Sequence, residues 1–201
     1  MFRSTYNDFA EDFSNTRTAL WPGVTKFLDS CAPGSKILDI GCGNGKYLSY
    51  RADDCEIHGC DTCFPLLKIA KGKHPKATII HADGTKLPYA DNCFDAVISI
   101  AVIHHLPLVA LRSMFVEELY RVLRPGGKAL VTVWATEALK NTWYHIGNND
   151  YIVPWKSKKK YDRFYHLYTK LEAESIFGNM CLKVAPDVDF ECNNWYVTIV
   201  K

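Results

Sequence analysis

Hydrophobic residues along the chain fall into two alternating patterns. Short apolar runs, such as 36–40 and 94–101, are typical of strands buried in a parallel sheet. Between such runs, apolar residues recur at helical spacing, as in the stripe from Leu108 to Val122. The patterns predict strands at 36–40, 56–60, 77–81, 94–101 and 128–134, and helices at 20–28, 46–51, 65–72 and 108–122. Because right-handed crossovers place helices on both faces of such a sheet, we expect an α/β fold.

The pattern changes after Trp134. Residues 136–165 have weak periodicity, so we predict no regular element there. A helix is expected at 169–177, followed by strands at 182–190 and 195–200. Since 201 residues correspond to about one domain, and no repeat or long linker interrupts them, we expect a single domain over 1–201.

Composition excludes several classes of protein. The 24 Lys and Arg residues nearly balance 22 Asp and Glu, which argues against a highly basic, histone-like nucleic-acid binder. The N-terminus has no apolar segment typical of a signal peptide, and the apolar run at 94–103 is too short to span a membrane. We therefore expect an intracellular protein that is cytoplasmic, with the nucleus as a second location, and that does not bind membranes. The eight cysteines are expected to be reduced, and the Cys60–Cys63 CxxC motif alone is a weak zinc signal, so no metal is expected.

A glycine-rich loop follows the strand predicted at 36–40. Its sequence, Asp39-Ile-Gly-Cys-Gly-Asn-Gly45, stands between a strand and a predicted helix, where glycines let the backbone approach a ligand closely. The spacing is GxGxG, and Lys46 occupies the position of the third glycine in a dinucleotide-binding motif. Asp39 could instead meet an ammonium group, so the loop suits a zwitterionic amino-acid tail better than a pyrophosphate.

Acidic residues also end the next two predicted strands. Asp61 follows Gly41 by 20 residues and is placed to accept hydrogen bonds from two ribose hydroxyls. Asp83 ends the following strand and could accept a hydrogen bond from an adenine amine. Because the carboxyl ends of parallel strands share one edge, the three acids indicate a nucleotide-like cofactor.

Five segments in order resemble motifs of the class I S-adenosylmethionine-dependent methyltransferases: 37–48, 59–61, 82–88, 94–106 and 123–131. The resemblance implies a Rossmann-like, mostly parallel seven-stranded sheet with an antiparallel C-terminal edge strand, and S-adenosylmethionine as cofactor. It divides the domain into an N-terminal helical cap (1–35), a cofactor-binding core (36–135) and a substrate-side loop with closing strands (136–201). The implied cofactor-site residues are Asp39, Gly41, Cys42, Gly43, Gly45, Asp61, Asp83, Gly84 and Ile100.

Further segments are similar to the tRNA wobble-uridine carboxymethyl methyltransferases, the Trm9-like family. They are 14–17, 21–22, 99–105, 134–135, 153–155 and 163–168. The resemblance implies methyl esterification of 5-carboxymethyluridine at the wobble position of tRNA. Some relatives carry a long charged insertion where this chain has only 156–162, so any function of that insertion is in doubt here. A methyltransferase of a small carboxylate or quinone, and a non-catalytic RNA-binding module that keeps the fold, remain as alternatives.

The implied reaction needs little acid–base chemistry. A carboxylate with a pKa of about 4 is already ionised at neutral pH, so the site must mainly hold it in line with the methyl sulfonium and exclude water. Arg17, His104, His105 and Arg163 are candidates for holding the carboxylate, and Trp134, Tyr165 and His166 for stacking on or bonding to a flipped-out base. The alternative for the histidines and aromatic residues is a role in packing alone.

Positive charge gathers in one short segment. Lys156, Lys158, Lys159, Lys160 and Arg163 lie within eight residues, where they either follow the phosphates of the tRNA anticodon arm or form a solvated loop. The resemblance also implies a small zinc-binding activator of the Trm112 type, paired with the strand at Ala77–His81. Any zinc would then belong to that partner.

Overall fold

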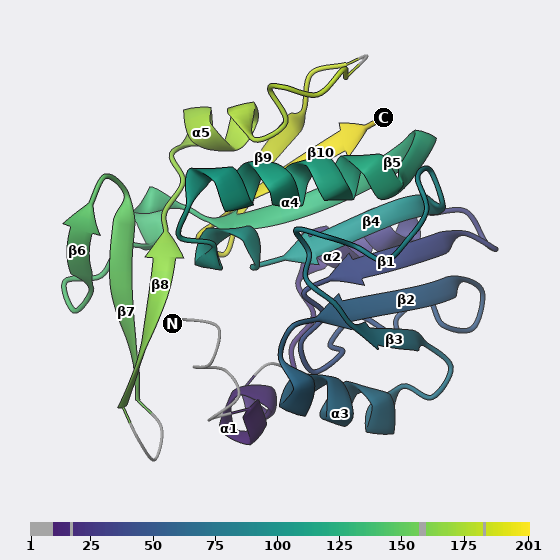
Figure 1. The fold of residues 1–201 in the computed structure, drawn as a ribbon, viewed down its shortest axis with the longest axis horizontal. Helices are drawn as coiled ribbons and strands as arrows, with labels where there is room; N and C mark the ends of the chain where they lie inside the picture. The colour runs from purple at the N-terminus through teal and green to yellow at the C-terminus, as the bar shows by residue number, and fades with distance from the viewer. Residues whose placement is uncertain (1–9, 17, 157–159, 183) are drawn as a thin grey trace.

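The computed structural model describes residues 10–16, 18–156, 160–182 and 184–201. A mixed seven-stranded sheet forms its centre, in the order β3-β2-β1-β4-β5-β10-β9 (Figure 1). Neighbours from β3 to β5 run parallel, whereas β10 is antiparallel to both β5 and β9. The strands are β1 (Lys36–Ile40), β2 (Glu56–Asp61), β3 (Thr78–His81), β4 (Phe94–Ile100), β5 (Leu123–Trp134), β9 (Asp187–Glu191) and β10 (Asn194–Val200). The expected Rossmann-like fold with antiparallel C-terminal strands is confirmed.

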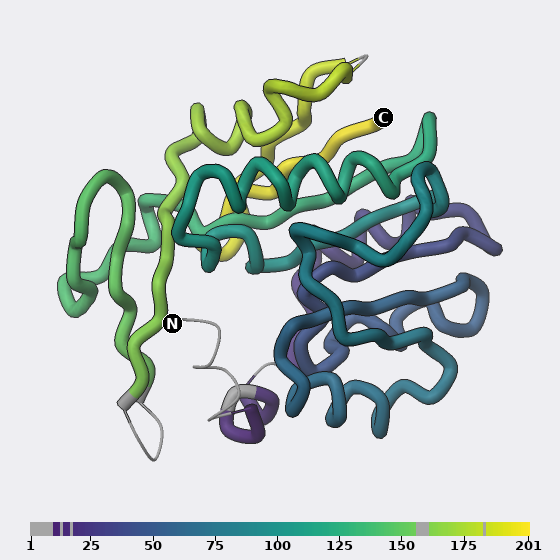
Figure 2. Tube along the Cα trace, in the orientation of Figure 1, coloured from purple at the N-terminus to yellow at the C-terminus, as the bar shows by residue number. Residues whose placement is uncertain are grey.

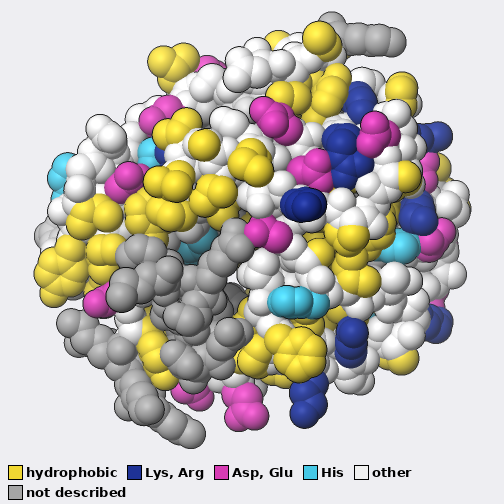
Figure 3. Space-filling model, viewed as in Figure 1, with side chains coloured by type: hydrophobic (Ala, Val, Ile, Leu, Met, Phe, Trp, Pro, Cys, Tyr) yellow, Lys and Arg dark blue, Asp and Glu magenta, His cyan; other side chains and the backbone are white. Residues whose placement is uncertain are grey.

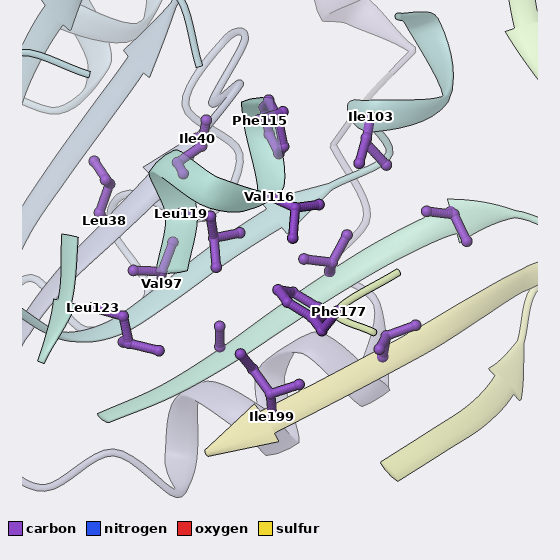
Figure 4. Close-up of a cluster of buried hydrophobic side chains, with 14 of the residues drawn as sticks. Leu38, Ile40, Val97, Ile103, Phe115, Val116, Leu119, Leu123, Phe177 and Ile199 are labelled. Atoms are coloured by element: carbon purple, nitrogen blue, oxygen red, sulfur yellow. The ribbon is translucent and has the colours of Figure 1, made fainter. Parts of the chain in front are cut away.

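Helices cover both faces of this sheet. α4 (Val109–Val122) and α5 (Lys170–Ser175) pack on one face, where Phe115, Leu119 and Phe177 join the buried cluster drawn in Figure 4. α2 (Pro22–Asp29) and α3 (Phe64–Lys73) cover the other face. In β1, the adjacent residues Ile37 and Leu38 point to opposite faces of the sheet. Both are apolar and buried, because helices pack on each face.

A second sheet of three antiparallel strands stands beside the first, as the chain trace in Figure 2 shows. Its strands are β6 (Tyr144–Gly147), β7 (Asp150–Lys156) and β8 (Lys160–His166). The sequence did not predict this sheet, because aromatic and polar side chains occupy both faces of its strands. In β8, Arg163 and Tyr165 share one face while Phe164 and His166 share the other, so no apolar–polar alternation marks the strand.

Several predicted boundaries were wrong. The helix expected at 46–51 is a series of turns, in which the amide of Leu48 bonds back to the carbonyl of Gly45 and that of Tyr50 to Tyr47, three residues earlier rather than four. The strand expected at 182–190 begins only at Asp187, and β5 begins five residues before the expected Lys128. Two 3₁₀ turns, η2 (Ile103–His105) and η3 (Thr136–Ala138), and the short helix α1 (Ala10–Asn15) were not predicted.

The parallel strands direct their carboxyl ends toward the three-stranded sheet (Figure 1). η2 follows β4 on this side, and the segment after β8 bonds to the end of β5 through the Tyr168 amide and the Trp134 carbonyl. The two sheets are therefore joined at the edge where the glycine loop and the acidic strand ends lie. Within the described residues, no helix is long and apolar enough to cross a membrane.

Candidate cofactor and substrate site

The glycine loop after β1 combines tight packing with an open side. Gly41 has φ +79°, and a Cβ there would overlap the side chain of Val102. Gly43 also has a positive φ, of 54°, but the nearest atom to a Cβ there would be Leu66 Cδ1 at 3.9 Å. The loop is thus fixed against the sheet at one glycine and leaves space beside the other, where a ligand could approach the backbone.

Asp61, at the end of β2, holds the loop from the neighbouring strand. Its carboxylate accepts hydrogen bonds from the amides of Gly43 at 2.9 Å and Cys63 at 2.7 Å. A carboxylate has about four lone-pair positions, so the backbone amides leave part of its capacity for the hydroxyls of a ligand. Burial raises the pKa of Asp61, and the hydrogen bonds from the backbone amides oppose that shift.

Asp39 is a second buried acid beside the loop. Burial, with the negative charge of Asp61 adding to it, raises the pKa of Asp39 to about 8, while Lys46 opposes the shift. At neutral pH the Asp39 carboxyl therefore carries a proton for most of the time. A cationic ligand group beside it would favour the ionised form, so the site is suited to an ammonium group.

The other residues implied for the cofactor site lie around the same edge. Asp83 Oδ1 accepts hydrogen bonds from the amide and the hydroxyl of Thr85, which fixes the turn after β3. A Cβ at Gly84 would overlap Phe115, and one at Gly45 would lie 2.6 Å from His74, so both glycines allow close packing. Cys42 is buried in the loop, and Ile100 is the last residue of β4. All of the residues implied for the cofactor site are thus brought to one edge of the sheet.

The segment before α2 lies against the glycine loop. Asn44 donates from Nδ2 to the carbonyl and the hydroxyl oxygen of Ser14, at 3.2 and 3.0 Å. Lys46 Nζ lies 4.6 Å from the ring centroid of Trp21 and 4.9 Å from that of Tyr47. Asn44 was not singled out from the sequence, because a lone polar residue in a glycine-rich loop carries no recognisable signal.

An aromatic cluster on the three-stranded sheet faces η2. The ring of Tyr165 has its centroid 4.9 Å from His104, 4.6 Å from His105 and 5.4 Å from Trp134. Trp143 extends the cluster, at 5.6 Å from Trp134. The sequence did not point to Trp143, because it stands alone in a segment without periodicity. Four of the predicted substrate-side residues, namely His104, His105, Trp134 and Tyr165, are thus in mutual contact.

Both histidines of the cluster are uncharged at neutral pH. Burial lowers the pKa of His105 to about 4, with Arg163 adding to the shift, and His105 Nδ1 donates to the carbonyl of Phe164 at 3.1 Å. Burial, then the neighbouring His105 and Arg163, lower the pKa of His104 well below its usual range. Neither histidine can therefore supply positive charge to a ligand.

Arg163 is the cation of the cluster. Its guanidinium carbon lies 4.9 Å from the ring centroid of Trp155 and 5.0 Å from that of Tyr165, and the residue is only 7% exposed. Among the residues that the structure describes, no carboxylate lies within 4 Å of it. Its Nε and both ring nitrogens of His104 are buried without a hydrogen-bond partner. Buried, unpaired donors are costly, so this arrangement is suited to an anionic ligand group.

Other predicted residues are not part of the cluster. His166 lies on the opposite face of β8, where its Nδ1 donates to Asp150 at 2.6 Å. Arg17, Lys158 and Lys159 fall outside the described residues. The backbones of Lys156 and Lys160 pair where β7 ends and β8 begins. In the described part of the chain, no group of three or more His, Cys, Asp or Glu residues is arranged to hold a metal ion.

The sequence is similar to known methyltransferases. Residues 38–131 match the family model described as "Methyltransferase domain". The tRNA (carboxymethyluridine(34)-5-O)-methyltransferase of Schizosaccharomyces pombe is 37% identical over 223 residues, covering 98% of this chain and 94% of the relative. The Arabidopsis thaliana protein of the same name is 49% identical over 154 residues, covering 75% of this chain, which spans 37% of that relative's length.

A solved structure agrees on the fold. The putative methyltransferase of Haloferax volcanii, in complex with its Trm112 methyltransferase activator, superposes with a TM-score of 0.73 at 15% identity, covering 100% of this chain and 97% of the other. At that identity the likeness extends to the fold alone. Together with the near full-length match to the S. pombe protein, the comparisons establish that this chain belongs to the tRNA (carboxymethyluridine(34)-5-O)-methyltransferase family.

Proposed function

We propose that this chain transfers a methyl group from S-adenosylmethionine to the carboxylate of 5-carboxymethyluridine at wobble position 34 of tRNA, as the names of its relatives describe. The observation that carries the proposal is Arg163, a buried guanidinium with no carboxylate within 4 Å among the described residues. It stands between two aromatic rings at the edge where the acidic strand ends meet. An anionic group on a flat base is the ligand that such a pair of features fits.

The glycine loop and the acids around it fit S-adenosylmethionine. Asp61 is placed to accept hydrogen bonds from the ribose hydroxyls, and the open side of Gly43 gives access to the backbone. An ammonium group beside Asp39 would stabilise its ionised carboxylate. Gly41, Cys42, Gly45, Asp83, Gly84 and Ile100 would complete the lining. When bound, the cofactor supplies an electrophilic methyl group on a sulfonium.

Asp39 gives cofactor binding a dependence on pH. With a pKa of about 8, the free carboxyl is protonated at pH 7, and the ammonium of the ligand favours its ionised form. Binding at neutral pH therefore releases a proton, and affinity should rise by up to about tenfold per pH unit between about pH 6 and about pH 7. Titration calorimetry in buffers of different ionisation enthalpy measures the release. In Asp39→Asn the release should vanish, and a wild-type enthalpy that is the same in every buffer would contradict this role.

The substrate side needs positioning rather than a base. A carboxylate with a pKa of about 4 is already ionised, so Arg163 can hold it by a bidentate pair of hydrogen bonds while neutral His104 offers a further donor. Trp134 and Tyr165 supply the flat surfaces against which the uracil ring would stack. Held in this way, the carboxylate oxygen can be aligned with the methyl group in a site from which water is excluded.

The lysines of the β7–β8 hairpin are proposed to contact phosphates of the anticodon arm. Lys156 ends β7 and Lys160 begins β8, and in the sequence between them stand Lys158 and Lys159 with no acidic residue. Replacing Lys158 and Lys159 with glutamine should lower the slope of log affinity against log salt concentration by about 2, because each phosphate contact contributes roughly one. RNA binding measured by anisotropy over a salt series tests this. Lys76→Gln, which removes a lysine paired with Asp53, serves as the control. An equal slope in both variants would exclude phosphate contacts by these lysines and favour the alternative of a solvated loop.

A small activator protein of the Trm112 type is proposed to bind the edge strand β3. Among the described residues, β3 pairs with β2 on one side and ends the sheet on the other, so its outer backbone groups are available for β-augmentation. Phe64 is 65% exposed beside it, with its ring 6.3 Å from that of His81. Any structural zinc would belong to the activator. An enzyme with a tRNA substrate would work in the cytoplasm or the nucleus.

The direct test is methyl transfer in vitro. The purified chain, with and without a Trm112-type activator, is incubated with S-adenosylmethionine carrying a labelled methyl group. The acceptors are an RNA stem–loop with 5-carboxymethyluridine at the wobble position, the same RNA with uridine, and free aromatic carboxylates and quinones. We expect label only in the first RNA, as a base-labile ester. Label in a small carboxylate or a quinone, with none in RNA, would overturn the proposed substrate.

A further inference from the structure

A cavity lies on the other face of β8 from the Tyr165 cluster. It encloses about 560 Å³ between the first half of α4, the turn joining β6 to β7, the end of β8 and α5. Of the residues implied for cofactor or substrate, only His166 lines it. Its volume is in the range of sites that bind small organic groups. Figure 3 shows hydrophobic side chains gathered on this side of the molecule, and Leu108 and Val109 at the start of α4 are among the exposed ones.

The cavity contains a buried hydroxyl without a partner. Tyr168 lines the cavity and is 4% exposed, and its hydroxyl oxygen makes no hydrogen bond among the described residues. Burial raises the pKa of Tyr168. The charges of Arg112 and Glu172, which line the same cavity, also act on this hydroxyl: Arg112 opposes the pKa shift and Glu172 adds to it. A buried hydroxyl without a hydrogen-bond partner destabilises the free protein. This points to a ligand that forms a hydrogen bond with it.

Arg112 and Glu172 face the same cavity without pairing with each other. Arg112 donates from Nη1 to the carbonyl of Leu106 at 2.9 Å, and no described carboxylate lies within 4 Å of its guanidinium. Glu172 Oε2 accepts from Thr169 and Asn149, whereas its Oε1 lies 3.9 Å from His166 Nε2, beyond hydrogen-bond distance. The cavity therefore offers donors on the α4 side and an acceptor on the α5 side.

The rest of the lining combines apolar side chains with polar ones, since Ser113, Asn148, Asn149, His166 and Ser175 also line the cavity. Ile103 and Val116 are buried, and Ile176 packs beside them. A ligand that fits this lining has apolar faces and an edge that carries both hydrogen-bond donors and acceptors. A nucleobase has this combination, and unpaired bases of RNA are commonly recognised by insertion into such pockets.

We propose that this cavity binds a nucleobase, namely an unpaired base of the tRNA anticodon loop other than the wobble uridine. The inference rests on the proposed tRNA substrate and adds a second contact on the opposite face of β8. Arg112 donates to a ring nitrogen or carbonyl oxygen of the base, Glu172 accepts from an amino or imino group, and the Tyr168 hydroxyl completes the edge. A free nucleoside has the same chemistry, so the experiment must separate the two sources.

The test combines base deletion with deletion of the hydroxyl. Anticodon stem–loop RNAs are prepared in which each loop nucleotide in turn lacks its base, and binding is measured by anisotropy for the wild type, Tyr168→Phe and Arg112→Met. Tyr168→Phe removes only the unpaired hydroxyl, so its melting temperature should not fall. Tyr196→Phe is the matched control, because Tyr196 also has a buried hydroxyl without a partner but lies on β10, away from the cavity.

We expect Tyr168→Phe to weaken binding of the intact RNA by about 3- to 10-fold, as the loss of a hydrogen bond implies, and Arg112→Met to weaken it more. With the one abasic RNA that lacks the inserted base, wild type and variants should bind equally, while Tyr196→Phe behaves as wild type throughout. A different result would be that free nucleosides bind with the same dependence on Tyr168, while the loss caused by Tyr168→Phe is the same for every abasic RNA. The cavity would then bind a free nucleoside or nucleotide, and the proposed contact with the anticodon loop would be wrong. Equal binding by all proteins of every RNA and nucleoside overturns the proposal, as does an effect of Tyr168→Phe on activator binding alone.

The same RNAs separate this inference from the proposed function. Transfer of methyl to the wobble carboxylate by the wild type, without any dependence of RNA binding on Tyr168, would contradict only the second site. Dependence on Tyr168 without methyl transfer would contradict only the proposed reaction. If both hold, Tyr168→Phe should raise KM for the RNA and leave kcat near that of the wild type.

Discussion

Replacing Arg163 with alanine should lower turnover of the carboxymethyluridine substrate by about 100-fold or more while the affinity for S-adenosylmethionine stays the same. Arg163 is the one cation of the aromatic cluster, because burial keeps His104 and His105 neutral at pH 7. Removing a charged donor that orients a reacting group typically costs a factor of about 10² to 10³ in kcat. Single-turnover kinetics with labelled cofactor, together with calorimetry of cofactor binding, measure the two quantities separately.

Two further arginine variants show whether the guanidinium itself is needed. Arg163→Lys keeps the charge but loses the planar fork and the stacking between Trp155 and Tyr165, so we expect it to recover only part of the lost turnover. Arg124→Ala removes an exposed arginine paired with Asp95 and should behave as wild type. Arg163→Ala also removes the packing of the guanidinium against Trp155 and Tyr165, so the melting temperature and cofactor affinity of each variant are compared. Normal turnover in a folded Arg163→Ala variant would exclude Arg163 from the site.

Asp61→Ala should weaken S-adenosylmethionine binding by about 100-fold or more. The carboxylate is placed to accept from two ribose hydroxyls, and each hydrogen bond to a charged group contributes about 1.5–3 kcal/mol. The substitution also removes the acceptor for the amides of Gly43 and Cys63, so the loop loses its support from β2.

A milder change at the same position separates these two effects. Asp61→Asn keeps one carbonyl oxygen and the size of the side chain, and we expect an intermediate loss of affinity. Calorimetry with S-adenosylhomocysteine, which lacks the positive sulfonium, should give the same ratio between variants, since Asp61 acts on the ribose. Unchanged affinity in Asp61→Ala would remove Asp61 from the cofactor site.

The sequence was sufficient for the main sheet and the cofactor edge because both follow from local patterns. Buried strands at 36–40 and 94–101 are apolar enough to be recognised alone, and the glycines and acids stand at strand ends that a parallel sheet brings together. The three-stranded sheet carries no such pattern. Its strands have aromatic and polar residues on both faces, so the sequence did not predict them. His166 lies on the opposite face from Tyr165 because consecutive residues of a strand alternate between faces.

The chemistry of the substrate side also depended on the fold. Two adjacent histidines at a strand end are compatible with cations, neutral donors or packing residues. The pKa of each is lowered because His104 is fully buried and His105 is partly buried beside it. In the same way, five positive residues within 156–163 look alike in the sequence. The structure places Arg163 between two rings, whereas Lys156 ends β7, Lys160 begins β8, and Lys158 and Lys159 fall outside the described residues.

The measurement that tests the central claim most directly is the nucleoside composition of tRNA from cells. The gene is disrupted in its own organism, and either the wild-type chain or the Arg163→Ala variant is expressed in its place. The digested tRNA is then analysed by mass spectrometry. We expect the methyl ester of 5-carboxymethyluridine to disappear on disruption, with the free acid accumulating, and to return with the wild-type chain but not with the variant. An ester level that is unchanged by disruption would contradict the account.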